Sequence, residues 1–280
     1  MRRPALPPPV RVLSLAAALL LLPVVACGAT PPPPPPAPLP HYSELGQLGA
    51  AVDNQLKLDR TAKITVAGSI TGGGRQITTT GDQLISYDPA GPSIQFTQKV
   101  QEQGTPVPSE TTMIILPDQA WLKPPAGSGL PLGKAWLKVP TSSEVPEVQQ
   151  VVSIVEAVRQ GAEMARSFTQ FGAAAAITES AEDPVAGIRA ERYRIRLDLA
   201  KAAELQPDPA IREQMRTAAI GASSIDATLW LDAHNRLLRQ LIQQPLPGGG
   251  GIQTTDAHYS AWGEPVQITP PPADQIIDDE

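Results

Sequence analysis

The chain has 280 residues, a formal charge of -6 at pH 7 and an aromatic content of only 4 %. An acidic chain is a poor partner for phosphate backbones, which argues against nucleic-acid binding as its function. Because the chain has a single cysteine, that thiol cannot belong to an internal disulfide.

The first residues have the pattern of a secretory signal. Three arginines precede an uncharged run from Val12 to Val25, and the small residue Ala26 follows it. The run is shorter than the roughly 20 apolar residues that a bilayer-spanning helix needs. We therefore predict that residues 1–26 are a signal peptide, and without its three arginines the formal charge falls from -6 to -9.

Cys27 stands where a bacterial lipoprotein carries its lipid. The segment V-V-A-C, Val24 to Cys27, resembles the lipobox, in which cleavage falls before a cysteine that carries diacylglycerol. It departs from the usual pattern in having valine instead of leucine at position 24. We expect Cys27 to be lipidated and the mature chain to be extracytoplasmic and anchored to the cell membrane, because two or more acyl chains anchor stably. The alternative is a secreted protein with a free cysteine.

Residues 27–42 are predicted to be a lipidated N-terminus followed by a linker. Six prolines, Pro31 to Pro36, favour polyproline II at about 3.1 Å per residue, which makes a semi-rigid spacer. An ordinary disordered leader is the alternative, and either one holds the following domain away from the membrane.

A lipid-binding domain is predicted over residues 43–268, and its first element is a helix. Apolar residues recur every three or four positions between Ser43, the expected N-cap, and Arg60. They are Leu45, Leu48, Val52 and Leu56. Alternation of apolar and polar residues then predicts strands over 64–70, 75–87 and 93–103, with turns at the glycines 72–74 and at 88–92.

Two similar segments follow, D-Q-A-W-L-K-P-P at 118–125 and G-K-A-W-L-K-V-P at 133–140. We predict that they pair as antiparallel strands and place Trp121 and Trp136 on one sheet, where aromatic contacts help to set the register. Packing is a better explanation of both tryptophans than stacking on a ligand.

After Pro146 the apolar period changes from two to 3.6, which predicts a helix over 146–172 that ends at Gly172. Its apolar face carries a row of valines, and because valine is a middling helix former the helix depends on tertiary burial. Gly161 is a plausible position for a bend. The valines are Val148, Val151, Val152, Val155 and Val158.

The last third returns to alternation. Strands are predicted over 192–199, 225–232, 237–243 and 252–262, with a short helix over 209–219. Arginines alternate along the first of these strands at 192, 194 and 196; a solvated face explains them better than an anion site. Residues 269–280 are predicted to be a disordered acidic tail.

A search for catalytic or metal chemistry finds no candidate, so neither an enzyme nor a cofactor is expected. The three histidines, His41, His234 and His258, have no second histidine or cysteine at metal-ligand spacing. The glycine-rich stretch 127–135 lacks the spacing and the final Ser or Thr of a phosphate-binding loop, and no G-x-S-x-G is present.

These elements predict an α+β fold, mainly antiparallel, in which about eleven strands form a sheet. A sheet this wide curls, here into an incomplete barrel whose concave apolar face the helices 43–60 and 146–172 cover. Because large side chains are scarce, we expect a hydrophobic cavity to remain; a fully packed core is the alternative. The predicted lining is Ile64, Val66, Ile94, Phe96, Val148, Val151, Val152, Val155, Val158, Ile195, Leu197, Leu229 and Leu231.

Three segments carry a resemblance to a known family. K-A-W-L-K-V-P at 134–140, D-P-V-A-G-I-R-A-E-R-Y-R-I-R-L-D-L at 183–199 and D-A-T-L-W-L-D-A-H-N-R-L-L-R at 226–239 resemble the actinobacterial LppX/LprG lipoprotein family over residues 43 to about 262. The resemblance implies an open half-barrel like that of the periplasmic lipoprotein carrier LolA, with a hydrophobic cavity under helices. It also implies a role in carrying lipids or glycolipids through the cell envelope. The family has no catalytic residues, and its one motif residue with chemistry corresponds to Cys27.

Three hypotheses follow from the sequence, of which an enzyme is the weakest, because no polar constellation for catalysis is found. The first is an anchored lipoprotein that binds acyl-chain lipids or glycolipids and passes them across the envelope, with an envelope lipid transporter as a further partner. The second is a non-enzymatic interaction or sensor lipoprotein with the same fold and a filled core.

Overall fold

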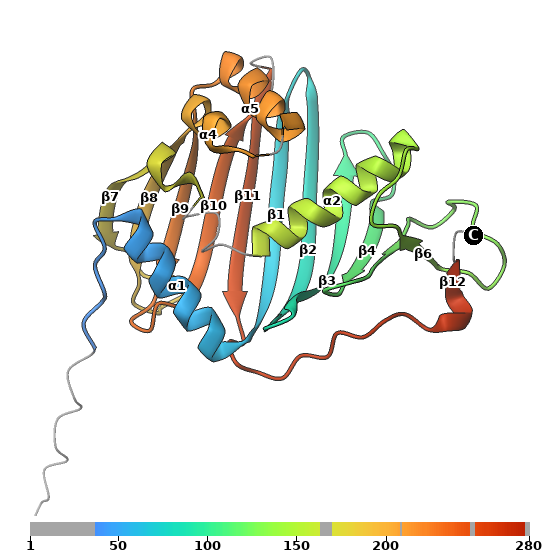
Figure 1. The fold of residues 1–280 in the computed structure, drawn as a ribbon, viewed down its shortest axis with the longest axis horizontal. Coiled ribbons are helices and arrows are strands. Elements are labelled where there is room, and N and C mark those ends of the chain that lie inside the picture. The colour runs from blue at the N-terminus through green and yellow to red at the C-terminus, as the bar shows by residue number, and fades with distance from the viewer. Residues whose placement is uncertain (1–36, 163–169, 208, 247–249, 278–280) are drawn as a thin grey trace, which may run out of the picture. The chain divides into compact units, whose positions relative to one another are not determined.

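The computed structural model of the protein describes residues 37–162, 170–207, 209–246 and 250–277. Helices lie over one sheet of twelve strands (Figure 1). The strands are β1 (Thr61–Gly72), β2 (Arg75–Asp88), β3 (Gly91–Glu102), β4 (Ser109–Ile115), β5 (Ala120–Lys123), β6 (Trp136–Val139), β7 (Ala175–Glu182), β8 (Glu191–Asp198), β9 (Ser224–Leu231), β10 (Leu237–Pro245), β11 (Gly251–Ser260) and β12 (Ile276–Ile277). The helices given with their bounds are α1 (Leu45–Asp59), α2 (Pro146–Ala162), α4 (Leu199–Leu205), α5 (Pro209–Gly221) and the short 3₁₀ turns η1 (Gly172–Ala174) and η3 (Ala273–Gln275).

The sheet has two hairpin-connected halves that meet in its centre. Its strand order is β12-β6-β5-β4-β3-β2-β1-β11-β10-β9-β8-β7, and neighbours are antiparallel except β12 and β6. β1 and β11, nearly 200 residues apart in the chain, pair from Lys63 opposite Ser260 to Gly72 opposite Gly251. This architecture confirms the predicted α+β class, with twelve strands instead of about eleven.

The β1–β2 hairpin forms where the glycine run was expected to turn the chain. Gly73 and Gly74 have φ values of 59° and 76°, which a residue with a Cβ adopts only at a cost. Strands β5 and β6 also pair as predicted, with Leu122 opposite Leu137 and Trp121 opposite Lys138. Trp121 is 3 % exposed and belongs to the core, which agrees with a packing role.

Helix α1 covers the half of the sheet that β8, β9 and β10 form. The four apolar residues predicted for its inner face are all buried there, and Leu48 is 0 % exposed. The N-cap is Glu44, without a side-chain hydrogen bond, so the predicted cap at Ser43 is wrong. The first core cluster consists of Leu45, Leu48, Val52, Leu56, Tyr193, Ile195, Leu229, Leu231 and Leu237.

Helix α2 lies across the other half of the sheet, on the same face as α1 (Figure 1). It begins at Pro146 as predicted, whereas residues 163–169 of the expected helix lie outside the described residues. Residues 170–171 are helical, and the 3₁₀ turn η1 begins directly after them at Gly172, where the helix was predicted to end. The second core cluster consists of Ala62, Ile64, Ile85, Ile94, Met113, Ile115, Ala120, Val155 and Ala257.

Three aromatic residues join the two clusters. Tyr87, Tyr259 and Trp262 pack against both, and the rings of Tyr259 and Trp262 stack with their centroids 5.8 Å apart. Burial raises the pKa of Tyr87 and of Tyr259, so both hydroxyls are neutral at any physiological pH. These rings therefore join the core under α1 to the core under α2, near the start of β1 and the end of β11.

Two segments depart from the predicted secondary structure. Leu199, expected in a strand, is the first residue of α4, because the Asp198 carboxylate accepts a hydrogen bond from the Lys201 amide at 3.0 Å and caps a new helix. Residues 269–277 are not a disordered tail: Ile276 and Ile277 pair with β6, and the Lys134 Nζ donates to the Ile276 carbonyl at 2.8 Å. The domain thus extends to at least residue 277.

The arginines of β8 are paired on the face opposite the helices. Arg194 contacts Glu179 at 3.0 Å, Arg196 contacts Asp226 at 2.9 Å, and Arg192 lies 3.5 Å from Asp183. Each guanidinium therefore has a carboxylate partner, which supports the solvated-face interpretation over an anion site.

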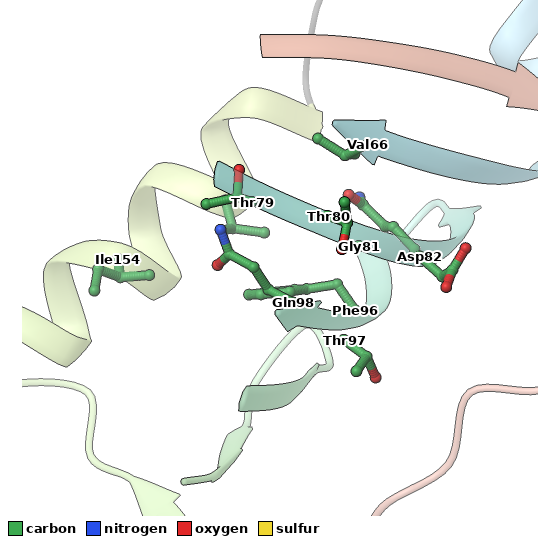
Figure 2. Close-up of a pocket in the computed structure, with 11 residues that line it drawn as sticks. Val66, Thr79, Thr80, Gly81, Asp82, Phe96, Thr97, Gln98 and Ile154 are labelled. Atoms are coloured by element: carbon green, nitrogen blue, oxygen red, sulfur yellow. The ribbon is translucent and has the colours of Figure 1, made fainter. Parts of the chain in front are cut away.

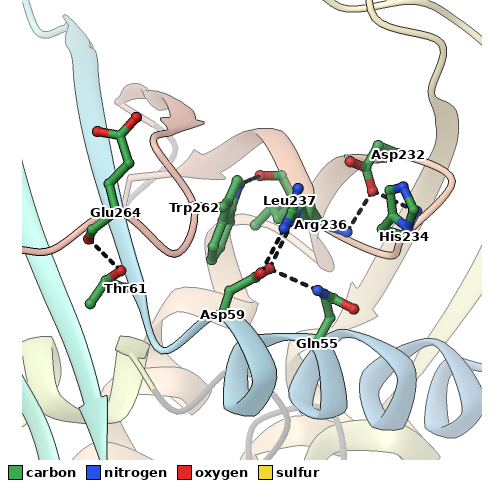
Figure 3. Close-up of polar contacts among 9 residues, drawn as sticks. All are labelled: Gln55, Asp59, Thr61, Asp232, His234, Arg236, Leu237, Trp262 and Glu264. Atoms are coloured by element: carbon green, nitrogen blue, oxygen red, sulfur yellow. Dashed lines mark hydrogen bonds and ion pairs between the residues drawn. The ribbon is translucent and has the colours of Figure 1, made fainter. Parts of the chain in front are cut away.

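A bidentate ion pair between Asp59 and Arg236 holds the end of α1 (Figure 3). Asp59 accepts hydrogen bonds from Arg236 Nε at 2.9 Å and Nη2 at 2.7 Å, and its side chain is 8 % exposed. The Arg236 guanidinium is the main cause of a pKa of Asp59 below its ordinary value. The pair therefore stabilises the fold at pH values above the ordinary aspartate pKa and is lost as the pH falls through the lowered value.

We expect Asp59→Asn to lower the free energy of unfolding by about 1–3 kcal/mol at pH 7, since it leaves a half-buried guanidinium without its charge partner. The difference from wild type should shrink below about pH 4, as the carboxylate of the wild type becomes protonated. Urea denaturation at several pH values measures both. Asp53→Asn on the same helix is the control, because the Asp53–Lys57 pair has a lysine side chain that is 70 % exposed. Equal losses for both variants, or a loss independent of pH, would contradict this account.

Candidate functional site

A pocket of about 230 Å³ lies between α2 and the sheet, over strands β1, β2 and β3 (Figure 2). It adjoins the second core cluster, but the side chains around it do not fill it. Ile154 of α2, 44 % exposed, stands at its border, so the pocket is open to solvent on that side. The lining is Val66, Thr79, Thr80, Gly81, Asp82, Gln83, Phe96, Thr97, Gln98, Ile154 and Val158.

Four apolar side chains form the walls. Val66 comes from β1, Phe96 from β3, and Ile154 and Val158, one helical turn apart, from α2. Figure 2 shows Ile154 on the helix on one side of the pocket, with Phe96 and Val66 on the strands across from it. Such walls exclude water and favour hydrocarbon, whose burial contributes about 25 cal/mol per Å².

The floor is main chain, because Gly81 has no side chain to cover it. Gly81 lies opposite Val66 on β1 and Gln98 on β3, on the face that carries the helices. A Cβ at this position would lie 2.7 Å from the carbonyl oxygen of Thr97, so the strands here are too close for any larger residue. Gly81 therefore both permits the strand packing and keeps the pocket open.

Uncharged polar groups complete the lining. Thr79 and Gln83 lie two positions to either side of Gly81 on β2, and Gln98 lies two positions after Phe96 on β3. All three are on the pocket face and offer hydroxyl and amide groups. Asp82 is the one charged residue among the described residues that line the pocket, and its side chain points to the opposite face (Figure 2). The site thus carries no general acid or base aimed into it.

Two larger hollows are more polar than this pocket. One, of about 550 Å³, lies on the opposite face of the same strands beside Lys99 and Glu110, and the other, of about 370 Å³, lies beside Arg196 and Lys201. Exposed charges and hydroxyls line both, so water fills them at little cost. Apolar walls, not volume, make the pocket under α2 the better candidate for an acyl chain.

The structure distributes the thirteen predicted lining residues over several places. Val66, Phe96 and Val158 line the pocket. Ile64, Ile94 and Val155 are buried in the second core cluster, Val151 packs against it, and Val152 is buried at 7 % exposure. Ile195, Leu229 and Leu231 are buried under α1. Val148 and Leu197 are half-buried, and Cys27 lies outside the described residues.

Ile154 and Gly81 are site residues that the sequence reasoning missed. Ile154 stands four residues before Val158, and this spacing places both on one side of the helix. The predicted lining follows the row of valines, which does not include Ile154. An isolated glycine in a strand indicates close backbone approach, which was a usable signal for Gly81. Thr79, Gln83 and Gln98 had no signal beyond their alternation with apolar neighbours.

Metal and membrane-spanning features are not found in the described part of the chain. No group of three histidine, cysteine, aspartate or glutamate side chains there is arranged to hold a metal ion. No described helix combines the length and apolar composition needed to cross a bilayer.

No known family model matches the chain, and no curated protein is similar to it in sequence. In structure it is similar to LprF from Mycobacterium bovis, with a TM-score of 0.41 and 14 % identity over 82 % of this chain and 99 % of that one. It is also similar to the Mycobacterium tuberculosis lipoprotein LppX, with a TM-score of 0.44 and 16 % identity over 80 % and 98 % of the two chains. A putative outer membrane lipoprotein-sorting protein domain from Vibrio parahaemolyticus matches with a TM-score of 0.29 and 10 % identity over 77 % and 89 %. These likenesses concern structure alone, because the sequence comparisons found no match.

Proposed function

We propose that this protein is an extracytoplasmic lipoprotein that binds the acyl chain of a lipid or glycolipid in the pocket under α2 and passes it across the cell envelope. Residues 1–26 act as its signal peptide and residues 27–42 as its lipidated N-terminus and linker. The observation that carries the proposal is an unfilled pocket with four apolar walls and no inward charge. The same lining supports a binding protein without a catalytic step.

The pocket has room for part of an acyl chain. An engineered apolar cavity of about 150 Å³ holds benzene, and sites for drug-sized ligands start at roughly 300 Å³. At about 230 Å³ the pocket lies between these, and its open side lets the rest of a chain continue outward. Each methylene that it buries stabilises the complex by about 0.8 kcal/mol.

Native mass spectrometry on protein purified from its own host tests the proposal. We expect a population of the mature chain to retain a bound species with the mass of an acyl lipid, which collisional activation releases. Protein that carries no lipid, and that after delipidation takes up no fluorescent fatty acid or glycolipid, would overturn the proposal.

An interaction or sensor module is the second candidate, favoured by the solid packing under α1. The first core cluster and the rings of Tyr87, Tyr259 and Trp262 fill that half of the sheet face. If this candidate is right, added lipid leaves the thermal stability unchanged, whereas a bound acyl chain raises it.

The proposed lipidation of Cys27 can be tested separately. Cys27→Ser removes the thiol that would carry diacylglycerol, so we expect the variant to move from the membrane fraction to the soluble fraction of fractionated cells. Ser43→Ala, a single substitution beyond the linker, should leave the protein in the membrane. Membrane retention of the Cys27 variant would show that another feature anchors the chain.

A further inference from the structure

The segment that joins the tether to the domain is fixed to the sheet. Along residues 37–42, which we call the strap, Arg189 Nη1 donates to the Ala37 carbonyl at 3.3 Å and the buried Tyr193 hydroxyl donates to the Pro40 carbonyl at 2.7 Å. His41 contacts Glu191 at 3.2 Å, and the Tyr42 hydroxyl donates to Asn235 at 2.8 Å. The tether therefore leaves the domain at a defined place, beside Arg189.

That place limits how far the domain can lie from a membrane that holds the lipid on Cys27. Nine residues lie between Cys27 and Ala37, so ten residue steps join them. An extended chain spans at most about 3.6 Å per residue, so the strap's first contact lies within about 36 Å of the lipidated cysteine. A tether this short favours orientations in which the edge formed by β7 and β8 faces the membrane.

An apolar turn projects from this edge. Val185 and Ile188 exchange two backbone hydrogen bonds of 2.9 Å, and the residues between them, Ala186 and Gly187, have φ values of 49° and 82°. This two-residue turn exposes Ala186, Gly187 and Ile188, and Ile188 is 50 % exposed. Arg189, which holds the strap, is the next residue along the chain.

The turn is rigid because its base is packed and bonded. Val185 packs against Ala190, Trp230 and Leu238 on the face opposite the helices, and Trp230 Nε1 donates to Asp183 at 3.0 Å. Its exposed apolar tip therefore needs no rearrangement to meet an apolar surface, and it loses little conformational entropy on contact.

A single exposed isoleucine is common on protein surfaces and by itself indicates nothing. Here it flanks the Ala186–Gly187 tip of a hydrogen-bonded turn and precedes Arg189, which contacts the strap, on the side that a short tether favours for the membrane. We propose that the 185–188 turn inserts its tip into the headgroup region of the bilayer that anchors the protein, so that the turn and the lipidated cysteine hold the domain against the membrane at two points, and not away from it as the prolines of the linker suggested. This inference rests on the proposed lipidation of Cys27.

The contact is apolar rather than electrostatic. Arg189 forms two hydrogen bonds to Glu182, at 2.7 and 3.0 Å, and Arg192 is paired with Glu179 and Asp183. These pairs leave no unpaired arginine among the described residues next to the turn. Insertion should therefore be as strong in neutral phosphatidylcholine as in a bilayer with anionic phosphatidylglycerol.

Site-specific fluorescence on the lipidated chain tests this contact. Because lipid blocks the one natural thiol, Ile188→Cys supplies a single reactive thiol for a fluorophore. We expect nitroxide-labelled phosphatidylcholine in reconstituted vesicles to quench a probe at 188 severalfold more than a probe on Ile220→Cys, which is 90 % exposed at the end of α5. Ala186→Cys gives a second probe on the same turn.

The outcomes separate the two proposals. Quenching at 188 and 186 but not at 220, equal in vesicles with and without phosphatidylglycerol, supports the inference. Protein that sediments with vesicles but shows no more quenching at the turn than at 220 overturns it and leaves the lipid anchor intact. Protein that does not sediment overturns the anchor, and the inference with it.

Discussion

Val158→Trp is expected to weaken acyl-chain binding by about 100-fold without unfolding the domain. The indole ring would project from α2 into the pocket and occupy the volume that a hydrocarbon needs. Displacing about four methylenes at about 0.8 kcal/mol each removes roughly 3 kcal/mol, which corresponds to about two decades in Kd. Titration of the delipidated protein with a fluorescent fatty acid measures the change.

Val107→Trp is the matched control for this effect. It makes the same substitution in the β3–β4 turn, where Val107 is 73 % exposed and does not line the pocket. Its Kd should stay within a factor of about two of wild type, since surface substitutions change free energies by less than about 0.5 kcal/mol. Undiminished binding by the Val158 variant, with its fold intact by circular dichroism, would place the acyl chain elsewhere.

Leu48→Ala is expected to lower the free energy of unfolding by about 2–5 kcal/mol, the range for buried leucines in well-packed cores. Leu48 is 0 % exposed in the middle of α1, surrounded by the first core cluster. The substitution loses the transfer free energy of the removed atoms and leaves a cavity. The other core residues keep α1 in place, so the cavity cannot fully close. Urea or thermal denaturation provides the measurement.

Leu58→Ala on the same helix isolates the contribution of burial. Leu58 is 76 % exposed, so the substitution removes the same atoms without creating a cavity. The change should lie within about 0.5 kcal/mol, with the higher helix propensity of alanine partly offsetting any loss. Similar losses at positions 48 and 58 would mean that α1 is not packed on the sheet as described.

Periodicity predicted most of the fold because one face of the sheet is apolar and the other is mainly polar. Along β1, Ile64 and Val66 face the helices while Thr65 and Ala67 face away, so a period of two is visible in the sequence. The spacing of three and four in α1 marks the stripe that the sheet buries. Where one residue decides the structure, as Asp198 does by capping α4, a pattern over several residues cannot show it.

The site could be predicted only in part, because alternation tells which face a side chain occupies but not what lies across from it. Ile94 and Phe96 share a face of β3, yet Ile94 is 0 % exposed in solid core and Phe96 lines the pocket. The difference depends on the path of α2 over the sheet and on Gly81, both of which are set by tertiary packing. The three aromatic residues that fill the space between the helices are likewise too far apart in the chain to be recognised together.

The pairing of β1 with β11 has a consequence for how the chain acquires its structure. Strands β1 to β6 and β7 to β11 each form from neighbours in the sequence, so either half-sheet can zip up from its own hairpins. The pairing of β1 with β11 requires the closure of a loop of nearly 200 residues. Such a high contact order makes the docking of the two half-sheets the slow step of folding. Until the two half-sheets dock, β1 and β11 are edge strands with unpaired backbone groups, which can pair with a second molecule and start aggregation. A chaperone that binds the nascent protein would prevent such pairing.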